Sequence, residues 1–219
     1  MRSVQHPDGH GVLLRLEIPD RTAHLPGQHY VIRLTAPDGY TAQRSYSIAS
    51  APHEELTEFY VERLPDGEVS GFLADVVEPG DRLRVRGPIG GWFVWQGDVP
   101  AVGLAGGSGV VPFISMLRHA ERVHADPLFR LAVAAKTMAD LPFADELISH
   151  GATIALSQVD RADRIRGRLR GSDLAPLVTP GQLGYVCGSA GFAESASQLL
   201  IDCGMPADHI RVERFGPSG

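Results

Sequence analysis

A strand, a glycine loop and the start of a helix follow one another in the stretch Ala101-Val102-Gly103-Leu104-Ala105-Gly106-Gly107-Ser108-Gly109-Val110-Val111-Pro112. Its first residues are apolar, its glycines can take conformations closed to other residues, and helical periodicity begins after them. Such a turn leaves backbone N–H groups unpaired at the positive end of a helix dipole. We therefore expect an anion site here, with a phosphate as its usual ligand.

The helix after this loop is expected from about residue 111 to residue 123. It would place Ile114, Leu117 and Ala120 on one face and charged residues on the other, so that it can pack on a sheet. The Gly-Gly-Ser-Gly spacing matches neither the G-x-G-x-x-G fingerprint nor the P-loop, which weakens an assignment to ATP or GTP hydrolysis. Taken alone, the loop leaves open a tight turn that binds nothing.

Composition places the chain among ordinary globular proteins. The 219 residues suit one large domain or two of about a hundred residues each. The hydrophobic fraction of 43% supports proper cores, and the formal net charge of −6 argues against a nucleic-acid partner. Two cysteines, Cys187 and Cys203, are too few for an iron–sulfur cluster, and the histidines show no metal-binding spacing. We expect no secretory signal, no membrane span and a cytoplasmic location.

The first half of the chain carries short strand patterns separated by Gly, Pro and Asp turns. Apolar and polar residues alternate from Val12 to Ile18, which predicts a half-buried strand. A short helix is expected at 68–77. Further strands are expected at 29–34, 44–48, 58–63 and 82–85. This spacing suggests an antiparallel barrel or sandwich.

After about residue 98 the pattern changes to continuous apolar runs alternating with amphipathic segments. The runs are 101–105, 128–135, 153–156, 184–187 and 210–212. This alternation indicates a parallel sheet covered on both faces. Ligands of such sheets bind outside the carboxyl ends of the strands, where the glycine loop and Cys187-Gly188 are expected to lie.

Four motifs in this order resemble those of the ferredoxin–NADP reductase family. They are Arg44-Ser45-Tyr46-Ser47, Gly87-Pro88-Ile89-Gly90, the glycine loop Gly106–Pro112, and Cys187-Gly188. The resemblance covers nearly the whole chain. It implies two domains: an antiparallel six-stranded Greek-key β-barrel at 1–98 that binds flavin, followed by an α/β parallel-sheet NAD(P)-binding domain at 99–219, with the site between them.

The first motif implies direct flavin contacts. By resemblance, Arg44 holds the flavin phosphates, Tyr46 packs on the isoalloxazine ring and Ser47 reaches its N5 atom; Ser45 lies between them. The chemistry fits independently, because Arg offers a planar fork, Tyr a π face and Ser a donor. Neighbouring strand residues point to opposite faces, so Tyr46 and Ser47 need a bend or strand end to serve one ring. An ordinary strand with a packed tyrosine is the alternative.

Other residues enter the implied site from three further segments. Gly67, Val69 and Ser70 match a G-x-x-S element whose backbone amides contact the flavin pyrophosphate, although Gly67 and Ser70 would equally suit a helix cap. Cys187 matches a cysteine near the nicotinamide C4, although a free cysteine is often a small buried hydrophobe. Glu213 and Phe215 match a C-terminal acid and an aromatic that covers the flavin and must move aside; the alternative for Phe215 is a residue that patches the domain interface.

The resemblance implies a flavoprotein oxidoreductase that takes hydride from NAD(P)H and passes electrons to a separate acceptor, such as an iron–sulfur protein or an oxygenase component. Ser47, Cys187 and Glu213 are its candidate catalytic residues. FAD is favoured and FMN stays open. NADPH and NADH also stay open, because Ser157-Gln158 replaces the Ser/Thr-Arg pair of NADP-preferring members, while Arg161, Arg164 or Lys136 could supply charge. Alternatives are a non-catalytic flavin- or nucleotide-binding subunit and a free flavin or ferric reductase.

Overall fold

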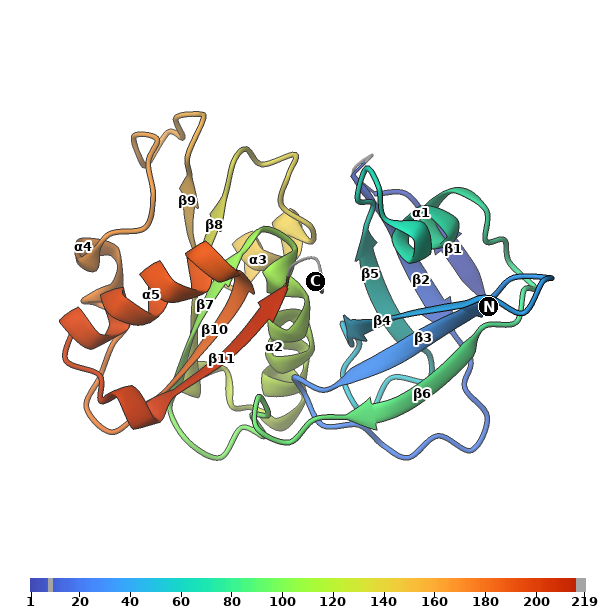
Figure 1. The fold of residues 1–219 in the computed structure, drawn as a ribbon. Helices are drawn as coiled ribbons and strands as arrows, with labels where there is room; N and C mark the ends of the chain where they lie inside the picture. Colours follow the sequence, from blue (N-terminus) through green and yellow to red (C-terminus); the bar gives the residue numbers. More distant parts are fainter. Residues whose placement is uncertain (8–9, 216–219) are drawn as a thin grey trace.

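The computed structural model describes residues 1–7 and 10–215, and it shows two halves that lie side by side (Figure 1). The first half holds antiparallel sheets and the second a parallel sheet with helices. No helix of the described residues has the length and apolar character needed to cross a bilayer.

The first half contains six strands that pair into two three-stranded antiparallel sheets, of order β1-β2-β5 and β4-β3-β6. The elements are β1 (Ser3–Gln5), β2 (Gly11–Leu16), β3 (His29–Thr35), β4 (Thr41–Ser47), β5 (Thr57–Glu62), α1 (Glu68–Asp75) and β6 (Arg84–Ile89). The five strands and the helix expected from the sequence are confirmed, with ends that shift by a few residues. The short β1 was not expected.

Strand β2 is buried on both faces, whereas its alternating pattern predicted a half-buried strand. Val12, Leu14 and Leu16 pack into the core of the first half. Leu13 points the other way and joins a core that continues into the second half, together with Tyr60 of β5. The second half therefore covers the face that the sequence pattern assigned to solvent.

The second half is built on a five-stranded parallel sheet of order β11-β10-β7-β8-β9, which confirms the α/β expectation. Its strands are β7 (Ala101–Gly106), β8 (Phe129–Ala135), β9 (Thr153–Leu156), β10 (Leu183–Ser189) and β11 (Ile210–Phe215). Its helices are α2 (Val111–Val123), α3 (Ala144–Ser149), α4 (Gly171–Leu174) and α5 (Ala190–Asp202), with short 3-10 turns η1 (Gly107–Val110), η2 (Asp126–Leu128) and η3 (Ala207–His209).

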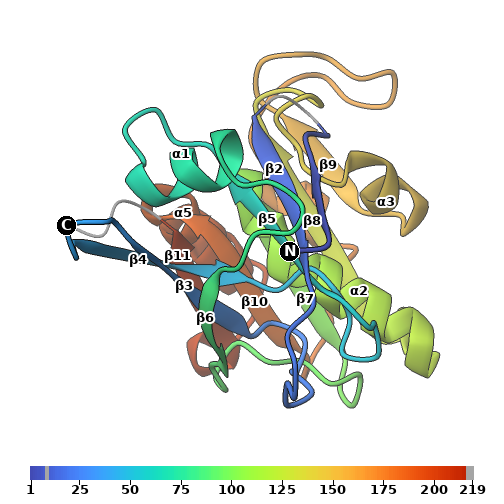
Figure 2. The same ribbon diagram turned by 90° about the vertical axis from the view of Figure 1, so that its right-hand side faces the viewer.

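The central strand β7 is apolar throughout because helices cover both of its faces. Ala101 and Ala105 belong to the core under α2, while Val102 and Leu104 belong to the core under α5. The two helices flank the sheet in Figure 2. The chain runs outward from β7 to β9 and then returns to β10 on the other side of β7, so the switch in strand order falls between β7 and β10.

The segment between the two halves is packed into the second. Phe93 contacts Phe113 and Tyr185 edge-on, with ring centroids 5.7 and 5.3 Å apart. Trp95 lies 4.8 Å from Phe129 and donates its indole N–H to the carbonyl of Val99. These side chains make the segment between the halves part of the core under α2.

An ion-pair network joins the halves through Arg118 of α2. Its Nη1 donates to Glu58 Oε1 of β5 at 2.8 Å, and its Nε and Nη2 donate to Glu146 of α3 at 2.7 and 2.9 Å. Glu58, whose side chain is 2% exposed, also accepts from Arg15 Nε of β2 at 2.7 Å. We call Arg15, Glu58, Arg118 and Glu146 the interface network.

Candidate functional site

A cleft of about 1820 Å³ opens where the end of β4 and the start of α1 face the carboxyl ends of the parallel strands. It is larger than the roughly 300–1,000 Å³ typical of a single small-ligand pocket, so it can take two sizeable ligands together. Thirteen of the predicted site residues line it: Arg44, Ser45, Tyr46, Ser47, Gly67, Val69, Ser70, Gly106, Gly107, Ser108, Gly188, Glu213 and Phe215. Gly109, Pro112 and Cys187 do not.

The first motif reaches the cleft at the end of β4. Tyr46 pairs with Tyr30 of β3, and burial raises the pKa of its phenol to about 12. Arg44 is exposed and bonds only the neighbouring carbonyl of Gln43 among the described residues. Ser47 is 4% exposed, and its Oγ has no hydrogen-bond partner within the described part of the chain. A buried hydroxyl without a partner is costly, which marks it as a group awaiting a ligand.

The glycine loop forms a 3-10 turn, η1, that runs directly into α2. Gly107 has φ +55°, in the left-handed region that glycine favours. A Cβ on Gly109 would lie 2.3 Å from the carbonyl oxygen of Cys187, so this residue packs the loop against β10 instead of facing the cleft. Pro112 is buried in the first turn of α2. The loop is therefore fixed by close backbone packing.

The end of β10 supplies the floor of the cleft. Gly188 lines it, and Ser189 accepts from the backbone N–H of Phe192 at 3.3 Å to begin α5. Cys187 is fully buried beneath Gly188, and burial, reinforced by Glu213, raises the pKa of its thiol. The thiol is thus a neutral group below the cleft surface.

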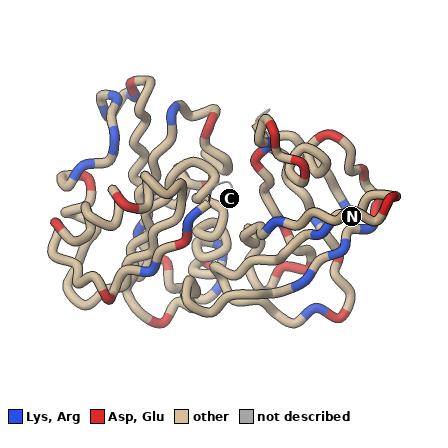
Figure 3. Tube along the Cα trace, in the orientation of Figure 1, with Lys and Arg blue, Asp and Glu red and all other residues tan. Residues whose placement is uncertain are grey.

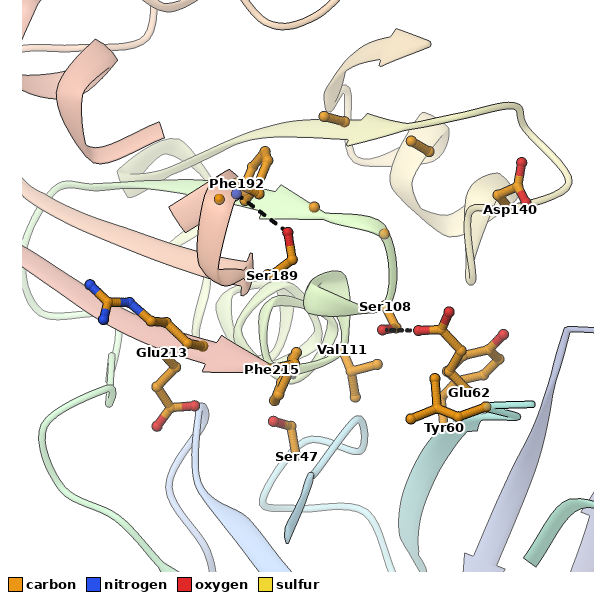
Figure 4. Close-up of a pocket in the computed structure, with 18 of the residues that line it drawn as sticks. Ser47, Tyr60, Glu62, Ser108, Val111, Asp140, Ser189, Phe192, Glu213 and Phe215 are labelled. Atoms are coloured by element: carbon orange, nitrogen blue, oxygen red, sulfur yellow. Dashed lines mark hydrogen bonds between the residues drawn. The ribbon is translucent and has the colours of Figure 1, made fainter. Parts of the chain in front are cut away.

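Two residues of β11 complete this wall. Glu213 lines the cleft, and burial raises the pKa of its carboxyl to about 7. Phe215 is partly buried against the core under α2. Figure 4 shows its ring in the same part of the cleft as the Ser47 side chain.

The start of α1 forms the outer rim. No side chain caps its first amides, and Val69 and Ser70 are buried there. Ser70 Oγ donates to the carbonyl of Gly67 and accepts from the N–H of Leu64, each at 3.3 Å, so the hydroxyl shapes the turn. The backbone amides, not the hydroxyl, are left for a ligand.

The sequence did not point to Glu62, at the end of β5. Its Oε2 accepts from Ser108 Oγ of the glycine loop at 2.5 Å, so the contact bridges the two halves (Figure 4). Glu62 and Ser108 are 46 residues apart in the chain, and they meet only because the fold brings β5 and η1 together.

The candidate nucleotide-selecting residues divide into two groups. Arg161 is paired with Asp163, and Arg164 with Asp173. Lys136 and Ser157, at the ends of β8 and β9, line the cleft. Arg168, which no motif pointed to, lines it too.

Comparisons with known proteins agree with this architecture. Residues 8–94 match a family model described as the oxidoreductase FAD-binding domain. The chain is similar to the ferredoxin reductase-like flavin- and nicotinamide-binding proteins. It is 31% identical to the reductase component of propane 2-monooxygenase from Gordonia sp., over 93% of this chain and 63% of that protein. It is also 31% identical to a flavohemoprotein of Rhodopirellula baltica, over 88% of this chain and 53% of that protein.

Solved structures show the same fold. The flavohem-like FAD/NAD-binding domain of nitric oxide dioxygenase from Vibrio cholerae has a TM-score of 0.86 at 24% identity, covering 99% of this chain and 97% of that one. A ferredoxin NADP+ reductase from Neisseria gonorrhoeae has a TM-score of 0.78 at 19% identity, covering 97% and 96%. This chain spans 52% to 63% of the length of the first three curated relatives.

The residues present fit FAD, the cofactor of this family's first domain. Ser47 offers a buried hydroxyl without a partner, Tyr46 offers a ring face, and Arg44 offers a guanidinium free of carboxylates among the described residues. Gly106, Gly107 and Gly188 line the opposite wall and add no side chains of their own there. These groups match an aromatic ring system that carries phosphates.

Proposed function

We propose that this protein takes hydride from NADH or NADPH onto bound FAD and passes the electrons to a separate acceptor. Residues 1–98 would bind the flavin, their two sheets acting together as a six-stranded Greek-key barrel, and residues 99–219 would bind the nicotinamide nucleotide. The position of Ser47, buried without a partner where both halves meet, carries this proposal.

The residues of the first half hold and orient the flavin. Bound FAD supplies a ring that accepts hydride and releases electrons onward. Ser47 would donate a hydrogen bond from its hydroxyl to a nitrogen of the ring, Tyr46 would pack against the ring, and Arg44 would pair with the phosphates. The free amides at the start of α1 bind the pyrophosphate.

The residues of the second half deliver the nicotinamide. Amides of the glycine loop bind its phosphates at the start of α2, and Gly188 lets the ring approach the floor closely. Glu213, whose pKa is about 7, can hold a proton at its carboxyl near neutral pH and accept or donate a hydrogen bond accordingly. Cys187, buried beneath the floor, helps to position the nicotinamide ring. Phe215 excludes water from the cleft until the nicotinamide takes its place.

The acceptor that we propose is an external iron–sulfur protein or an oxygenase component. The similarity to the propane 2-monooxygenase reductase component supports this choice. So does the similarity to the reductase subunit of glycine betaine monooxygenase from Chromohalobacter salexigens, which is 32% identical over 87% of this chain.

The test begins with purification, absorption spectroscopy and identification of the extracted flavin. We expect a yellow protein that holds FAD and oxidises NADH or NADPH with menadione, a small uncharged acceptor. Ser47→Ala should retain FAD and slow its reduction by roughly 10–100-fold, while Ser149→Ala, an exposed hydroxyl on α3, should change neither. A colourless protein that neither binds FAD nor oxidises NAD(P)H would contradict the proposal, and flavin binding without turnover would favour a non-catalytic subunit.

A further inference from the structure

Acidic side chains line the cleft although its proposed ligands carry phosphates. They come from both halves and are Glu62, Asp66, Glu68, Asp140, Glu194 and Glu213. Figure 3 shows that acidic positions occur in both halves of the chain. The Glu62 carboxylate contacts the glycine loop itself, the segment that we assign to the phosphates of the nicotinamide nucleotide. A negative charge held at a phosphate site bears on which phosphates can bind there.

The contact is a direct hydrogen bond from one half to the other. Ser108, in η1, donates its Oγ hydroxyl to Glu62 Oε2 at 2.5 Å. A distance this short is typical of a hydroxyl bonded to an ionised carboxylate. Both side chains line the cleft, and Figure 4 shows the bond between them. The charged end of Glu62 is thus held beside the loop that runs into α2.

The position of Glu62 in the fold does not require its charge. Glu62 is exposed and ends β5, where it lies opposite Gly11. Its carboxylate forms no ion pair within the described part of the chain, and the neighbouring Arg63 is paired with Asp75. An uncharged glutamine has the same reach and could accept the same bond from Ser108. The bridge between the halves therefore does not explain why this residue is an acid.

A phosphate at the glycine loop would meet this carboxylate. No side chain caps the first amides of η1 or α2, so these amides and the Ser108 hydroxyl can donate to a ligand. The hydroxyl has one proton, which bonds either Glu62 or a phosphate oxygen. Repulsion between the carboxylate and the phosphate grows with the charge of the phosphate. A phosphate inside a pyrophosphate linkage carries a single charge, whereas a terminal monoester carries about −1.5 to −2 at pH 7.

We propose that Glu62 is a specificity-determining residue, which lets the glycine loop accept the internal pyrophosphate of a dinucleotide and reject a terminal phosphate in the same place. This inference rests on the proposed function, and it adds which phosphate chemistry the nucleotide site selects. Specificity often depends on a repulsive element of this kind. The carboxylate weakens the binding of every phosphate, but it weakens nucleoside diphosphates more than NADH or NADPH.

The experiment compares two probes that differ at one phosphate. ADP ends in a phosphate monoester where ADP-ribose, with the same adenosine, continues into a second ribose. Calorimetric titration of the FAD-loaded protein at low ionic strength gives Kd for both; their 2′-phosphorylated forms are used if the protein prefers NADPH. We expect Glu62→Gln to tighten ADP binding roughly tenfold and ADP-ribose binding roughly threefold, because the terminal phosphate carries about twice the charge. Added salt should reduce this difference.

Two further variants test where the charge acts. Glu121→Gln removes the same charge from an exposed position of α2 outside the cleft and should leave both Kd values unchanged. Ser108→Ala removes the bond that holds the carboxylate at the loop, so adding Glu62→Gln to it should change the ratio of the two Kd values less. Equal tightening of both probes by Glu62→Gln would overturn the proposal. So would a full effect of Glu62→Gln in the Ser108→Ala background.

Failure of the proposed function gives a different result. Without menadione reduction by the unmodified protein, the oxidoreductase activity is refuted, and the titrations still decide the role of Glu62. If neither the unmodified protein nor Glu62→Gln binds ADP-ribose, this inference is refuted even where menadione is reduced.

Discussion

Replacing Arg118 with methionine tests whether the interface network holds the two halves together. Methionine keeps the apolar stem of the side chain and removes its charge. Glu58, 2% exposed, then loses the bond from Arg118 Nη1 and keeps only Arg15. Glu146 is 25% exposed and can be hydrated after the change.

These differences set the size of the effect. Removing one partner of a fully buried pair costs about 3–5 kcal/mol, and an exposed pair contributes about 0–1 kcal/mol. Because Glu58 keeps a second arginine and Glu146 gains water, we expect Arg118→Met to lower the free energy of unfolding by about 2–3 kcal/mol. Arg63→Met is the matched control, since Arg63 and Asp75 form an exposed pair between β5 and α1, and should cost less than about 1 kcal/mol.

Urea unfolding at one fixed FAD concentration measures both variants. Tryptophan fluorescence reports on Trp92 and Trp95, which lie near the junction of the halves, while far-UV circular dichroism reports on the whole chain. We expect the two transitions to coincide in the unmodified protein and to separate in Arg118→Met. A free energy for Arg118→Met no lower than that for Arg63→Met would refute the role assigned to the interface network.

Two further predictions concern the cleft walls. The raised pKa of Glu213 means that the folded protein binds this proton more tightly than the unfolded chain, so stability falls as pH rises from about 4.5 to about 7 and is level above that. Across that pH range Glu213 should change the free energy of unfolding by up to about 3 kcal/mol, and Glu213→Gln should remove this change in unfolding titrations. An unchanged pH dependence in the variant would contradict the assignment. Gly109→Ala should cost about 1–3 kcal/mol in urea unfolding, because the new Cβ meets the Cys187 carbonyl oxygen. Gly71→Ala, inside α1 with nothing within 4 Å, should instead stabilise by about 0.5–1 kcal/mol, and similar results for both glycines would refute the packing argument.

Much of the fold was predictable from local patterns. The helix at 111–123 and the strand at 153–156 have the predicted bounds, because apolar periodicity and glycine punctuation act within a few residues. Strand β1 was missed because three residues are too few for a pattern. The two-sided burial of β2 was missed because alternation cannot show what covers the other face.

The motifs of the candidate site could be predicted from the sequence, but the burial of its residues and the contacts between distant segments could not. The resemblance brought together Tyr46, Ser47 and Gly188 at one cleft, although their roles stay predictions. It could not show that Cys187 lies wholly beneath the surface, since burial depends on how η1 packs on β10. The Ser108–Glu62 bond arises from contact between segments that are distant in the sequence, so no local pattern predicts it.

The packing of Phe93 and Trp95 determines where the chain can be divided into separate fragments. The hydrophobic pattern changes near residue 98, but these two rings belong to the core that lies under α2. A fragment starting at residue 99 would lose the partners of Phe113, Tyr185 and Phe129, and the complementary fragment would display two large aromatic rings to water. A fragment meant to contain the second half alone should therefore begin before residue 93, so that it keeps Phe93 and Trp95 together with the residues they pack against.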